Sequence, residues 1–581
     1  MKKLTQAEDH PVDKLKPFEG HPFYVKDDEL FYNTLSNKNI PFQVTLDFCG
    51  DLEYEIRYYS ALYDTQISED GKNVFYADKY NEDGSVSLYY RNIEKTDSPA
   101  IKLDSGISHF KASKDGKKVV YKKGDTLYEH NLKEKNKIDS DVEIYYISED
   151  LEKIVYKNSD NDLYFKQEGQ AKVKIDSNIS SVEYLGENYE YVVYTKEEAI
   201  YKSTIGKDKV KIASDVHSVV AVYETGEMYY TKETIDMVSW MQYIDDDMLD
   251  TDNALAEIDY PSRPYSYEYD TYEEYEEAYA AYEKAYEKYY ENRDAIEEKT
   301  IRDNLRSLLK EKQREVFSYA LYYYNGDSEE LVVKEGYNYE SLNDTPVVAY
   351  VEKVKSSSKI KMSSLDIDNI YSFSDLEYII YEAEDYDRKY SVVIGENVST
   401  FESTNLSRLE IDSKSENIYY IANDSGEVNH GDLYKFNLSS KKTEIYDTDV
   451  FIDELDIYDD NILYFKNVDV ESEHGELYIN QKLIDYDVYR YRIVDYYDKL
   501  YYYVDRDIED SNGTLKVYDG KKIEKISDDV NTYDVAPNGD VYFLSNYSMK
   551  YYTGTLMQYK KGKINHIDDD VSELLVLSHS D

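Results

Sequence analysis

A short acidic loop carries the side chains whose spacing best suits a metal ion. Asp505, Asp507, Asp510 and Asn512 lie in the stretch DRDIEDSNG, which ends at Gly513. Oxygen ligands at such spacing are the ones that calcium prefers in loop sites. The stretch lacks the glutamate that closes an EF-hand loop, and ordinary solvated turns use the same residue types. The sequence therefore favours an ordinary turn, and calcium is the one cofactor hypothesis that it supports.

The sequence assigns no catalytic residues. It contains no G-x-S-x-G, H-E-x-x-H, Walker A or dinucleotide-binding motif, and its nine histidines show no pair at metal-ligand spacing. With 121 aspartates and glutamates, no pair of carboxylates can be singled out for acid–base catalysis. The absence of motifs favours a protein that is not an enzyme, although some enzymes assemble their sites from distant loops.

A row of tyrosines is the second group of residues with a chemistry of its own. Tyr272, Tyr275, Tyr279, Tyr282 and Tyr286 recur at alternating spacings of three and four residues. This spacing places them on one face of a helix. Tyrosine is enriched in interface cores, so the row is a candidate partner-binding surface. The alternative is that it packs against a second helix of the same protein.

The elements that would position this row interrupt an otherwise regular pattern at residues 246–315. Thr271 and Glu274 fit a capping box at the start of a first helix, and a second helix is expected at about 301–315. We predict a helical hairpin that projects from one repeat unit, between its second and third strands.

Internal repeats predict the fold around this insertion. The pattern I-x-x-[DN]-[VI], here called the crossing signature, recurs at a common spacing of 35 to 42 residues. Clear copies are Ile138–Val142, Ile175–Ile179, Ile212–Val216, Ile394–Val398, Ile484–Val488, Ile526–Val530 and Ile567–Val571, with looser copies at Leu103–Ile107 and Ile445–Val450. A second pattern, G-x-L, here called the glycine signature, follows a tyrosine-rich strand and an acidic turn, as at Gly431, Gly475, Gly513 and Gly554.

Each unit reads as four short antiparallel strands joined by Asn, Asp and Gly turns, which is typical of a propeller blade. We therefore predict an all-β fold: a β-propeller of four-stranded modules, in one large ring or two rings, with the helical hairpin inserted. A shorter helix is expected at 374–384, with Ser374 as its cap. The predicted divisions are an N-terminal extension at 1–21, propeller modules at 22–245, the insertion at 246–315 and further modules at 316–581.

The two ends of the chain predict how the ring closes. Only one strand, at 572–578, follows the last crossing signature, whereas residues 23–35 read as the second and third strands of a unit. The two fragments complement each other. We expect the closing strand to complete the first blade, which leaves no bare sheet edge there.

Charge and composition limit the partners. The net charge is -53, from 68 Lys and Arg against 121 Asp and Glu. A surface this acidic repels phosphate backbones, so no nucleic-acid partner is expected. The start of the chain has no apolar stretch of a signal peptide, no run of about 18 apolar residues is present for direct membrane insertion, and Cys49 is the only cysteine. The chain is expected to be either cytoplasmic or the soluble part of a protein anchored elsewhere.

These repeats and the tyrosine-rich, acidic insertion resemble a group of uncharacterised clostridial proteins. In that group a zinc ribbon and a transmembrane helix precede an extracytoplasmic, tyrosine- and acid-rich β-propeller domain. The repeats are also similar to the low-density-lipoprotein-receptor-like propeller domains of Firmicutes. The resemblance spans roughly residues 22–581 and implies a cell-surface location, although this chain has neither zinc ribbon nor membrane segment. It implies no residue roles.

We therefore expect a non-enzymatic binding or sensing propeller that recognises a protein, peptide or glycan ligand. Two alternatives stay open. One is a carbohydrate-active propeller hydrolase or lyase that uses paired carboxylates. The other is a structural interaction scaffold without a small ligand.

Overall fold

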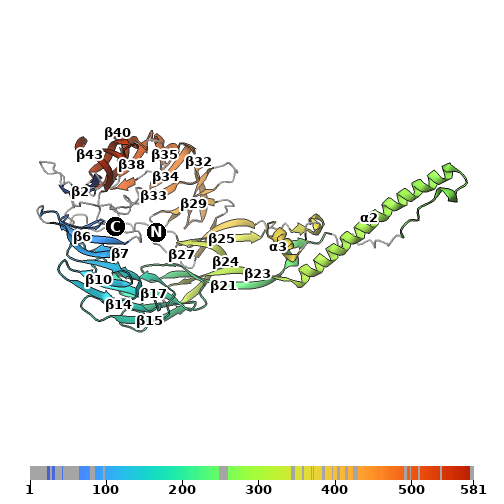
Figure 1. Ribbon diagram of the computed structural model, residues 1–581, viewed down its shortest axis with the longest axis horizontal. Helices are drawn as coiled ribbons and strands as arrows, with labels where there is room; N and C mark the ends of the chain where they lie inside the picture. The colour runs from blue at the N-terminus through green and yellow to red at the C-terminus, as the bar shows by residue number, and fades with distance from the viewer. Residues whose placement is uncertain are drawn as a thin grey trace.

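The fold of β-propeller type is built from small antiparallel sheets that follow one another in chain order (Figure 1). The computed structural model describes residues 22–575 apart from 27–28, 33–41, 44–64, 79–84, 96–98, 248–258, 342–346, 356–358, 368–369, 371, 383–385, 395–396, 402–405, 413–415, 423–428, 459–460, 490–493, 497–498, 508–510 and 537–538. Five sheets have four strands each, and each pairs its strands in sequence order. We call such a four-stranded unit a blade.

The first four blades are regular four-stranded sheets. Their strands are β4 (Gln66–Ile67), β5 (Asn73–Asp78), β6 (Val86–Asn92), β7 (Ile101–Ile107); β8 (His109–Ala112), β9 (Val119–Lys123), β10 (Thr126–His130), β11 (Lys135–Asp139); β12 (Val142–Ile147), β13 (Lys153–Asn158), β14 (Leu163–Gln167), β15 (Val173–Asp176); and β16 (Ser181–Leu185), β17 (Tyr191–Lys196), β18 (Ala199–Thr204), β19 (Val210–Ala213). A single 3₁₀ turn, η1 (Glu187–Tyr189), lies between β16 and β17.

Later blades join into larger sheets because one strand continues from the outer edge of a blade into the next blade. A seven-stranded sheet contains β20 (Ser218–Val222), β21 (Met228–Ser239), β23 (Gln313–Tyr324), β24 (Glu329–Ser341), β25 (Val347–Lys355), β27 (Tyr386–Ile394) and β28 (Asn397–Phe401). The early residues of β24 pair with β23 and its last residues pair with β25, so this strand belongs to two blades.

The second half of the chain repeats the same plan. A separate blade contains β29 (Leu406–Ile411), β30 (Asn417–Ala422), β31 (His430–Asn437) and β32 (Lys442–Phe451). The largest sheet contains β33 (Leu455–Tyr458), β34 (Asn461–Asp469), β35 (His474–Ile479), β36 (Lys482–Tyr489), β37 (Val494–Tyr496), β38 (Lys499–Val504), β39 (Gly513–Tyr518), β40 (Ile523–Val535), β41 (Val541–Ser548), β42 (Thr553–Lys560), β43 (Lys563–Leu575), β1 (Phe23–Lys26), β2 (Glu29–Tyr32) and β3 (Phe42–Gln43).

In most copies the crossing signature marks the point where the chain passes from one blade to the next, but the copy Ile394–Val398 lies between the paired strands β27 and β28 of a single blade. At the crossings the Asp or Asn residue has a left-handed backbone, with φ of 64° at Asp141, 55° at Asn178 and 56° at Asp487. Asn, Asp and Gly adopt this conformation most readily, which explains the choice of residue type and the glycine at position 106 in a looser copy. The Val or Ile that follows is buried, as at Val142.

The glycine signature occupies the strand opposite the crossing signature. Gly431 pairs with Val450, Gly475 with Val488 and Gly554 with Val571. A Cβ atom at Gly431 would lie 2.7 Å from the carbonyl oxygen of Ala422, so only glycine fits there. The two repeated patterns are therefore hydrogen-bonding partners within each of these blades.

Apolar clusters fill the space between consecutive blades. One cluster joins Phe75 and Leu88 of the first blade to Phe110 and Val119 of the second. Equivalent clusters recur at the following junctions, so the core is divided into slabs between sheets. A tyrosine from the second strand of many blades is fully buried in a slab, as at Tyr156 and Tyr194.

A polar contact, here called the clasp, recurs at the edge of these slabs. An aspartate of the crossing signature, at its second position except for Asp447 in the looser copy Ile445–Val450, accepts a hydrogen bond from a tyrosine hydroxyl of the next blade and pairs with lysines. Asp176 accepts a bond of 2.8 Å from Tyr194 and lies 3.3 Å from Lys196 Nζ. The clasps are Asp104–Tyr121, Asp139–Tyr156, Asp176–Tyr194, Asp447–Tyr464, Asp485–Tyr502 and Asp568–Tyr24.

Burial and hydrogen bonding shift the pKa values of the clasp groups in opposite directions. Burial alone would raise the pKa of Asp176, but hydrogen bonds from Lys209, the Ser177 amide and Tyr194 outweigh it and lower the pKa to about 2. Burial, together with the bond to Asp176, raises the pKa of Tyr194 well above its ordinary value. The clasp thus holds a charged carboxylate and a neutral phenol at neutral pH.

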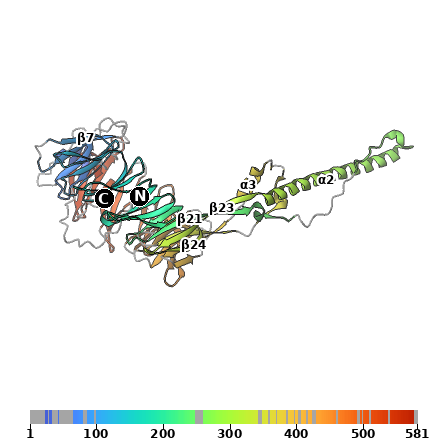
Figure 2. The same ribbon diagram turned by 90° about the horizontal axis from the view of Figure 1, so that it is seen from below.

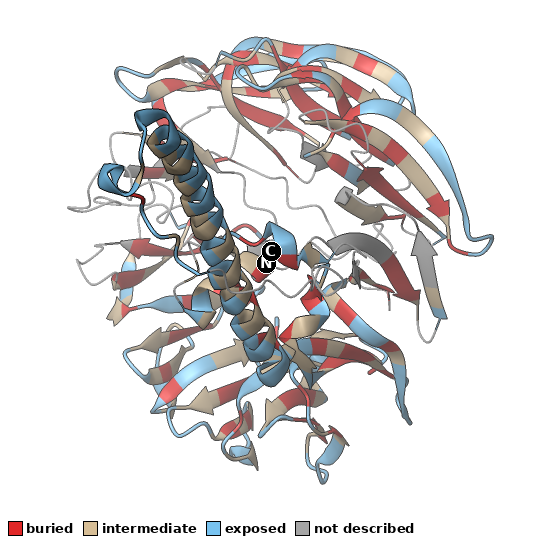
Figure 3. Cartoon of the chain, turned by 90° about the vertical axis from the view of Figure 1, so that its right-hand side faces the viewer, coloured by how far each residue is buried: buried red, intermediate tan, exposed pale blue. Residues whose placement is uncertain are grey.

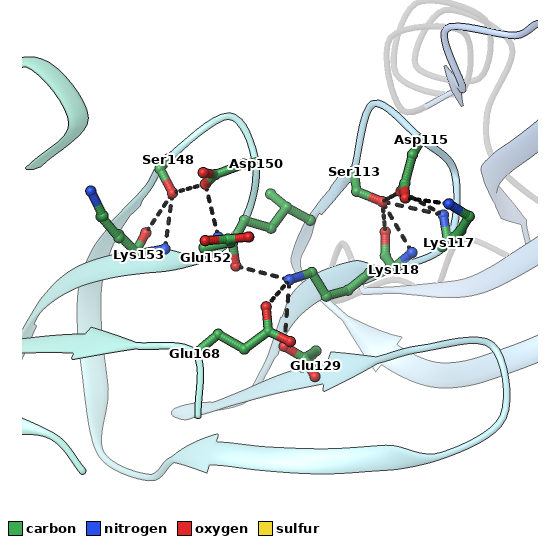
Figure 4. A network of polar contacts seen from close by, with 11 residues as sticks. Ser113, Asp115, Lys117, Lys118, Glu129, Ser148, Asp150, Glu152, Lys153 and Glu168 are labelled. Carbon is green, nitrogen blue, oxygen red and sulfur yellow. Dashed lines mark hydrogen bonds and ion pairs between the residues drawn. The ribbon is translucent and has the colours of Figure 1, made fainter. Parts of the chain in front are cut away.

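The turns between the first and second strands form a further connection between blades (Figure 4). Ser113 donates to Asp115, and Ser148 donates to Asp150 in the same position of the next blade. Lys118 bridges the two blades, because its Nζ lies 3.4 Å from the Leu151 carbonyl oxygen and 2.6 Å from Glu168.

The two ends of the chain meet in one sheet, as the sequence predicts. Strand β1 pairs with the end of β43, for example Tyr24 with Leu574. Asp568 also forms the clasp contacts with Tyr24 and Lys26, at 2.7 and 2.8 Å. The N-terminal strands therefore take the place of the next blade. The predicted closing strand lies within β43 as far as Leu575, and residues 576–578 lie outside the described residues.

The insertion lies between β21 and β23, the second and third strands of their blade, as predicted. The prediction of a helical hairpin is wrong, because residues Tyr272–Glu311 form one continuous helix, α2. The stretch contains no glycine or proline, and Thr300 keeps its hydroxyl inside the helix by donating to the Ile296 carbonyl oxygen at 2.8 Å. The capping box of Thr271 and Glu274 is confirmed.

The shorter helix predicted at 374–384 exists as α3 (Phe373–Glu382). Its cap is Ser372 rather than Ser374: the Ser372 amide and hydroxyl donate to the Asp375 carboxylate at 2.7 and 2.9 Å. Both serines precede an acidic residue at the spacing of a capping box, so the local pattern could not decide between them.

Candidate binding surface on the projecting arm

Helix α2 and the chain segment that precedes it form an arm that projects far from the sheets (Figures 1 and 2). At 1.5 Å per residue, a helix of 40 residues is about 60 Å long. Figure 3 shows buried residues throughout the sheets, whereas the arm is intermediate or exposed along most of its length. Within α2, Arg302 and Leu309 near the base are the residues classed as buried.

A small apolar core of its own fixes the base of the arm. Trp240, Tyr243 and Leu309 come from the first insertion, and they pack with Leu376 and Ile380 of α3. Helix α3 belongs to a second insertion, between β25 and β27 of the next blade. Short strands from the two insertions, β22 (Ile244–Asp245) and β26 (Ile360–Lys361), also pair in parallel. Two neighbouring blades therefore hold the arm together.

Buried arginines tie α2 to this base. The Arg302 guanidinium donates to the carbonyl oxygens of Met362 and Leu365, and it pairs with Glu298 at 2.8 Å. Arg306 Nη2 lies 2.7 Å from the Asp246 carboxylate. Because Met362 lies in η5 (Met362–Ser364) of the second insertion, Arg302 joins the two insertions directly.

The predicted site tyrosines form a row on one face of α2. Tyr275, Tyr279, Tyr282 and Tyr286 are half-buried, and consecutive ring centroids are 5.8, 5.9 and 5.6 Å apart. Tyr272 continues the row at the end of the helix and is 71% exposed.

An extended segment covers part of this row. The sequence-based alternative, in which the row packs against a second helix, is therefore wrong about the covering element. Tyr260 contacts Tyr286 with ring centroids 5.8 Å apart, and the Arg263 guanidinium lies over Tyr279. Pro264 of the same segment is buried. Tyr269 then contacts Tyr275 close to the tip.

The tip contains aromatic residues that the sequence analysis did not single out. Tyr265 and Tyr267 stack with ring centroids 5.5 Å apart around the turn η4 (Ser266–Glu268), and Tyr267 is 79% exposed. The alternation of tyrosine with acidic residues just before the Thr271 cap was the available signal. A hollow of about 570 Å³ lies beside this turn and is lined by Glu268, Tyr269, Asp270, Glu274, Glu277 and Ala278.

Three of the four predicted calcium ligands, Asp505, Asp507 and Asn512, lie within the described residues. Asp510 lies outside the described residues, and the Asn512 carbonyl oxygen accepts a bond of 2.9 Å from the Asp507 amide. A hydrogen bond with Asp487, aided by burial, raises the pKa of Asp505. Among the described residues no group of three His, Cys, Asp or Glu side chains is arranged to hold a metal ion.

Comparisons with known proteins leave the family open. No family model and no curated protein matches the chain. Among solved structures, the tricorn protease is 11% identical over 95% of this chain, with a TM-score of 0.25, and the chain spans 46% of its length. A eukaryotic initiation factor is 7% identical over 87% of this chain and 98% of its own, with a TM-score of 0.33.

A third similar structure is the β-propeller domain of the Trilobed protease from Pyrococcus furiosus. It is 10% identical over 73% of this chain and 95% of its own, with a TM-score of 0.23. At these scores the description of the fold depends on the strand pairing given above. Within the described part of the chain, no helix has the length and apolar character needed to cross a bilayer.

Proposed function

We propose that this protein is a non-enzymatic binding propeller whose arm docks a protein partner, in a single large ring that serves as its platform. The observation that carries the proposal is the contrast between the base and the outer part of the arm. The base is held by an apolar core with residues from two blades and by the buried Arg302 of α2, which donates to the second insertion. The outer part presents tyrosine rings to solvent.

This arrangement suits recognition because it presents contact area at little entropic cost. Tyrosine rings have few rotatable bonds, and the base fixes the direction of the helix. The ring itself is supported by the clasp between Asp568 and Tyr24, which repeats the internal blade contacts at the meeting point of the chain ends. A location outside the cytoplasm, as part of an anchored protein, fits this role and belongs to the proposal.

The test shortens the arm without disturbing its base. Removing residues 261–285 and joining Tyr260 to Tyr286 through a short Gly-Ser linker is sterically reasonable, because these two rings already touch. We expect the full chain, but not the shortened one, to capture a specific protein from extracts of its source organism, and the purified partner to rebind only the full chain. Equal capture by both chains, with identical thermal unfolding, would refute arm docking.

A carbohydrate-active hydrolase is the second candidate, and one observation favours it. Asp487 and Asp505 share a hydrogen bond that, together with burial, raises the pKa of Asp505, and His474 Nδ1 lies 3.1 Å from Asp487. Glycoside hydrolysis uses one carboxyl with a raised pKa as the general acid and a second carboxylate about 5 Å or more from it, so a bound sugar would have to separate this pair. Release of reducing sugar from a polysaccharide panel by the wild type, and its loss in both Asp487→Asn and Asp505→Asn, would support this function over the first.

A further inference from the structure

The strongest unexplained surface in the molecule is the outer end of the arm, where acidic side chains surround the exposed tyrosines. Between residues 263 and 283 the acidic residues are Glu268, Asp270, Glu273, Glu274, Glu276, Glu277 and Glu283, and the one basic residue is Arg263. Arg263 lies over the Tyr279 ring. In the described part of the arm, no ion pair involves any of these seven carboxylates within 4.0 Å.

The blades show what this protein does elsewhere with the same pair of groups. In the clasps, a phenol ring and a carboxylate together hold a lysine. Lys172 pairs with Asp139 at 2.6 Å while its Nζ lies 4.7 Å from the Tyr164 ring centroid. Lys135 pairs with Asp104, and its Nζ lies 3.9 Å from the Tyr128 ring centroid. Lysine, carboxylate and ring form a complete set at these junctions.

The arm tip also brings a tyrosine ring and carboxylates together. Tyr269, Asp270 and Glu274 border the same hollow of about 570 Å³, and Glu277 and Ala278 form its helical side. Tyr267 and Tyr272, 79% and 71% exposed, are close in sequence to these lining residues, and each keeps most of its surface in solvent although it contacts one neighbouring ring. A cation that enters such a place is attracted both by carboxylates and by ring faces.

We propose that the arm tip is the docking surface for a basic segment of a partner protein, whose lysine or arginine side chain enters the hollow between residues 268–270 and the first turns of α2. This inference depends on the proposed arm docking and names the chemistry of the partner. Charge complementarity identifies the occupant, since an acidic or phosphate-bearing partner would be repelled. Ring faces attract a guanidinium or ammonium group placed over them.

The test measures binding of a short fluorescein-labelled peptide of alternating arginine and serine to the full chain by fluorescence anisotropy. The tip variant is Glu273→Gln, Glu276→Gln and Glu277→Gln combined, which spares the capping residue Glu274. The matched control changes Glu287, Glu291 and Glu297 to glutamine, farther along the same helix. Both variants alter the net charge equally.

We expect the tip variant to weaken peptide binding about tenfold and the control to change it less than about twofold. Combined Tyr267→Ala and Tyr272→Ala substitutions should also weaken it, and a peptide with glutamine in place of arginine should not bind. Equal weakening by the tip and control variants would overturn the proposal in favour of general charge attraction.

Full competition by micromolar calcium chloride, with no effect of the tyrosine substitutions, would overturn it in favour of a metal site. The proposed function is tested separately by the shortened arm. If shortening abolishes capture of the partner while the tip variant captures it normally, arm docking stands and the basic occupant is wrong. If shortening has no effect, arm docking itself fails.

Discussion

Tyrosines serve two different purposes in the blade junctions and in the arm. At the junctions, Tyr156 is 1% exposed and donates to Asp139 of the preceding blade. In the arm, Tyr282 is half-buried, lies between the rings of Tyr279 and Tyr286, and shares a hydrogen bond with Tyr260 rather than with a carboxylate. The comparison teaches that abundance of one residue type does not indicate one role: the hydroxyl partner and the depth of burial decide between structure and recognition.

The largest expected effect comes from truncating one tyrosine of each kind, which tests whether the two kinds differ in their contribution to stability. Tyr156→Ala removes a buried ring and leaves Asp139 without its hydroxyl donor, so we expect a loss of about 3–5 kcal/mol in unfolding free energy. Tyr282→Ala should cost below about 1 kcal/mol, because alanine favours the helix and little burial is lost. Urea unfolding measures both, and similar losses at the two positions would contradict the distinction.

A second prediction concerns Arg302 at the base of the arm. This side chain is buried and hydrogen-bonded, as the tyrosines of the blade junctions are, whereas most residues at the tip are exposed. Arg302→Met should leave the Met362 carbonyl oxygen without its donor and cost about 2 kcal/mol of local stability. The effect should appear as faster proteolysis near η2 (Trp240–Tyr243) and α3. The exposed Arg293→Met in the same helix is the control, and equal protection in both variants would show that Arg302 does not hold the base.

A third prediction concerns Glu573, a carboxyl on the closing strand β43. Burial raises its pKa to about 7, and no hydrogen bond from another side chain to its carboxyl is present among the described residues. Because the folded pKa lies above the ordinary value of 4.5, stability falls as pH rises from about 4.5 to about 7.

Glutamine at position 573 cannot ionise, so Glu573→Gln should be more stable than the wild type by about 2 kcal/mol at pH 8 and nearly equal to it at pH 4. Thermal unfolding at the two pH values measures the difference. A constant difference at both would exclude ionisation as the cause.

The smallest expected effect is the acid sensitivity of a single clasp. The pKa of Asp176 is lowered to about 2 from 3.8, so its contribution is complete above about pH 4 and is lost as pH falls toward 2. Asp176→Asn should lower the unfolding free energy by about 1–2 kcal/mol at pH 7. At pH 2 the substitution should lower it by almost nothing, because the wild-type carboxylate has already lost its contribution there. The control Asp294→Asn, at an exposed position on the arm, should change the unfolding free energy at neither pH.

The repeats could be predicted because each requirement is local. A left-handed crossing at Asp141 requires Asp, Asn or Gly, and the close backbone approach at Gly431 requires glycine, so both leave marks in the sequence. The separation of 17 residues between Asp139 and Tyr156, and between Asp447 and Tyr464, was equally visible.

The arm base could not be predicted, because its parts are far apart in the chain. Trp240 and Leu376 meet only because their blades are neighbours. The tyrosine spacing indicated a helix face but not the extended segment around Tyr260 that covers it, since that segment has no periodic pattern. The acid-rich tip before Thr271 was visible but was not recognised as a surface.

The anchoring of the arm in two adjacent blades has a mechanical consequence. Over a length of about 60 Å, a tilt of about 5° at the base displaces the far end by about 5 Å. A slight rotation of one blade against its neighbour is therefore magnified into a movement as large as a side chain. Strain between the two blades would thereby change the position of the far end, and load on that end would produce torque between the two blades.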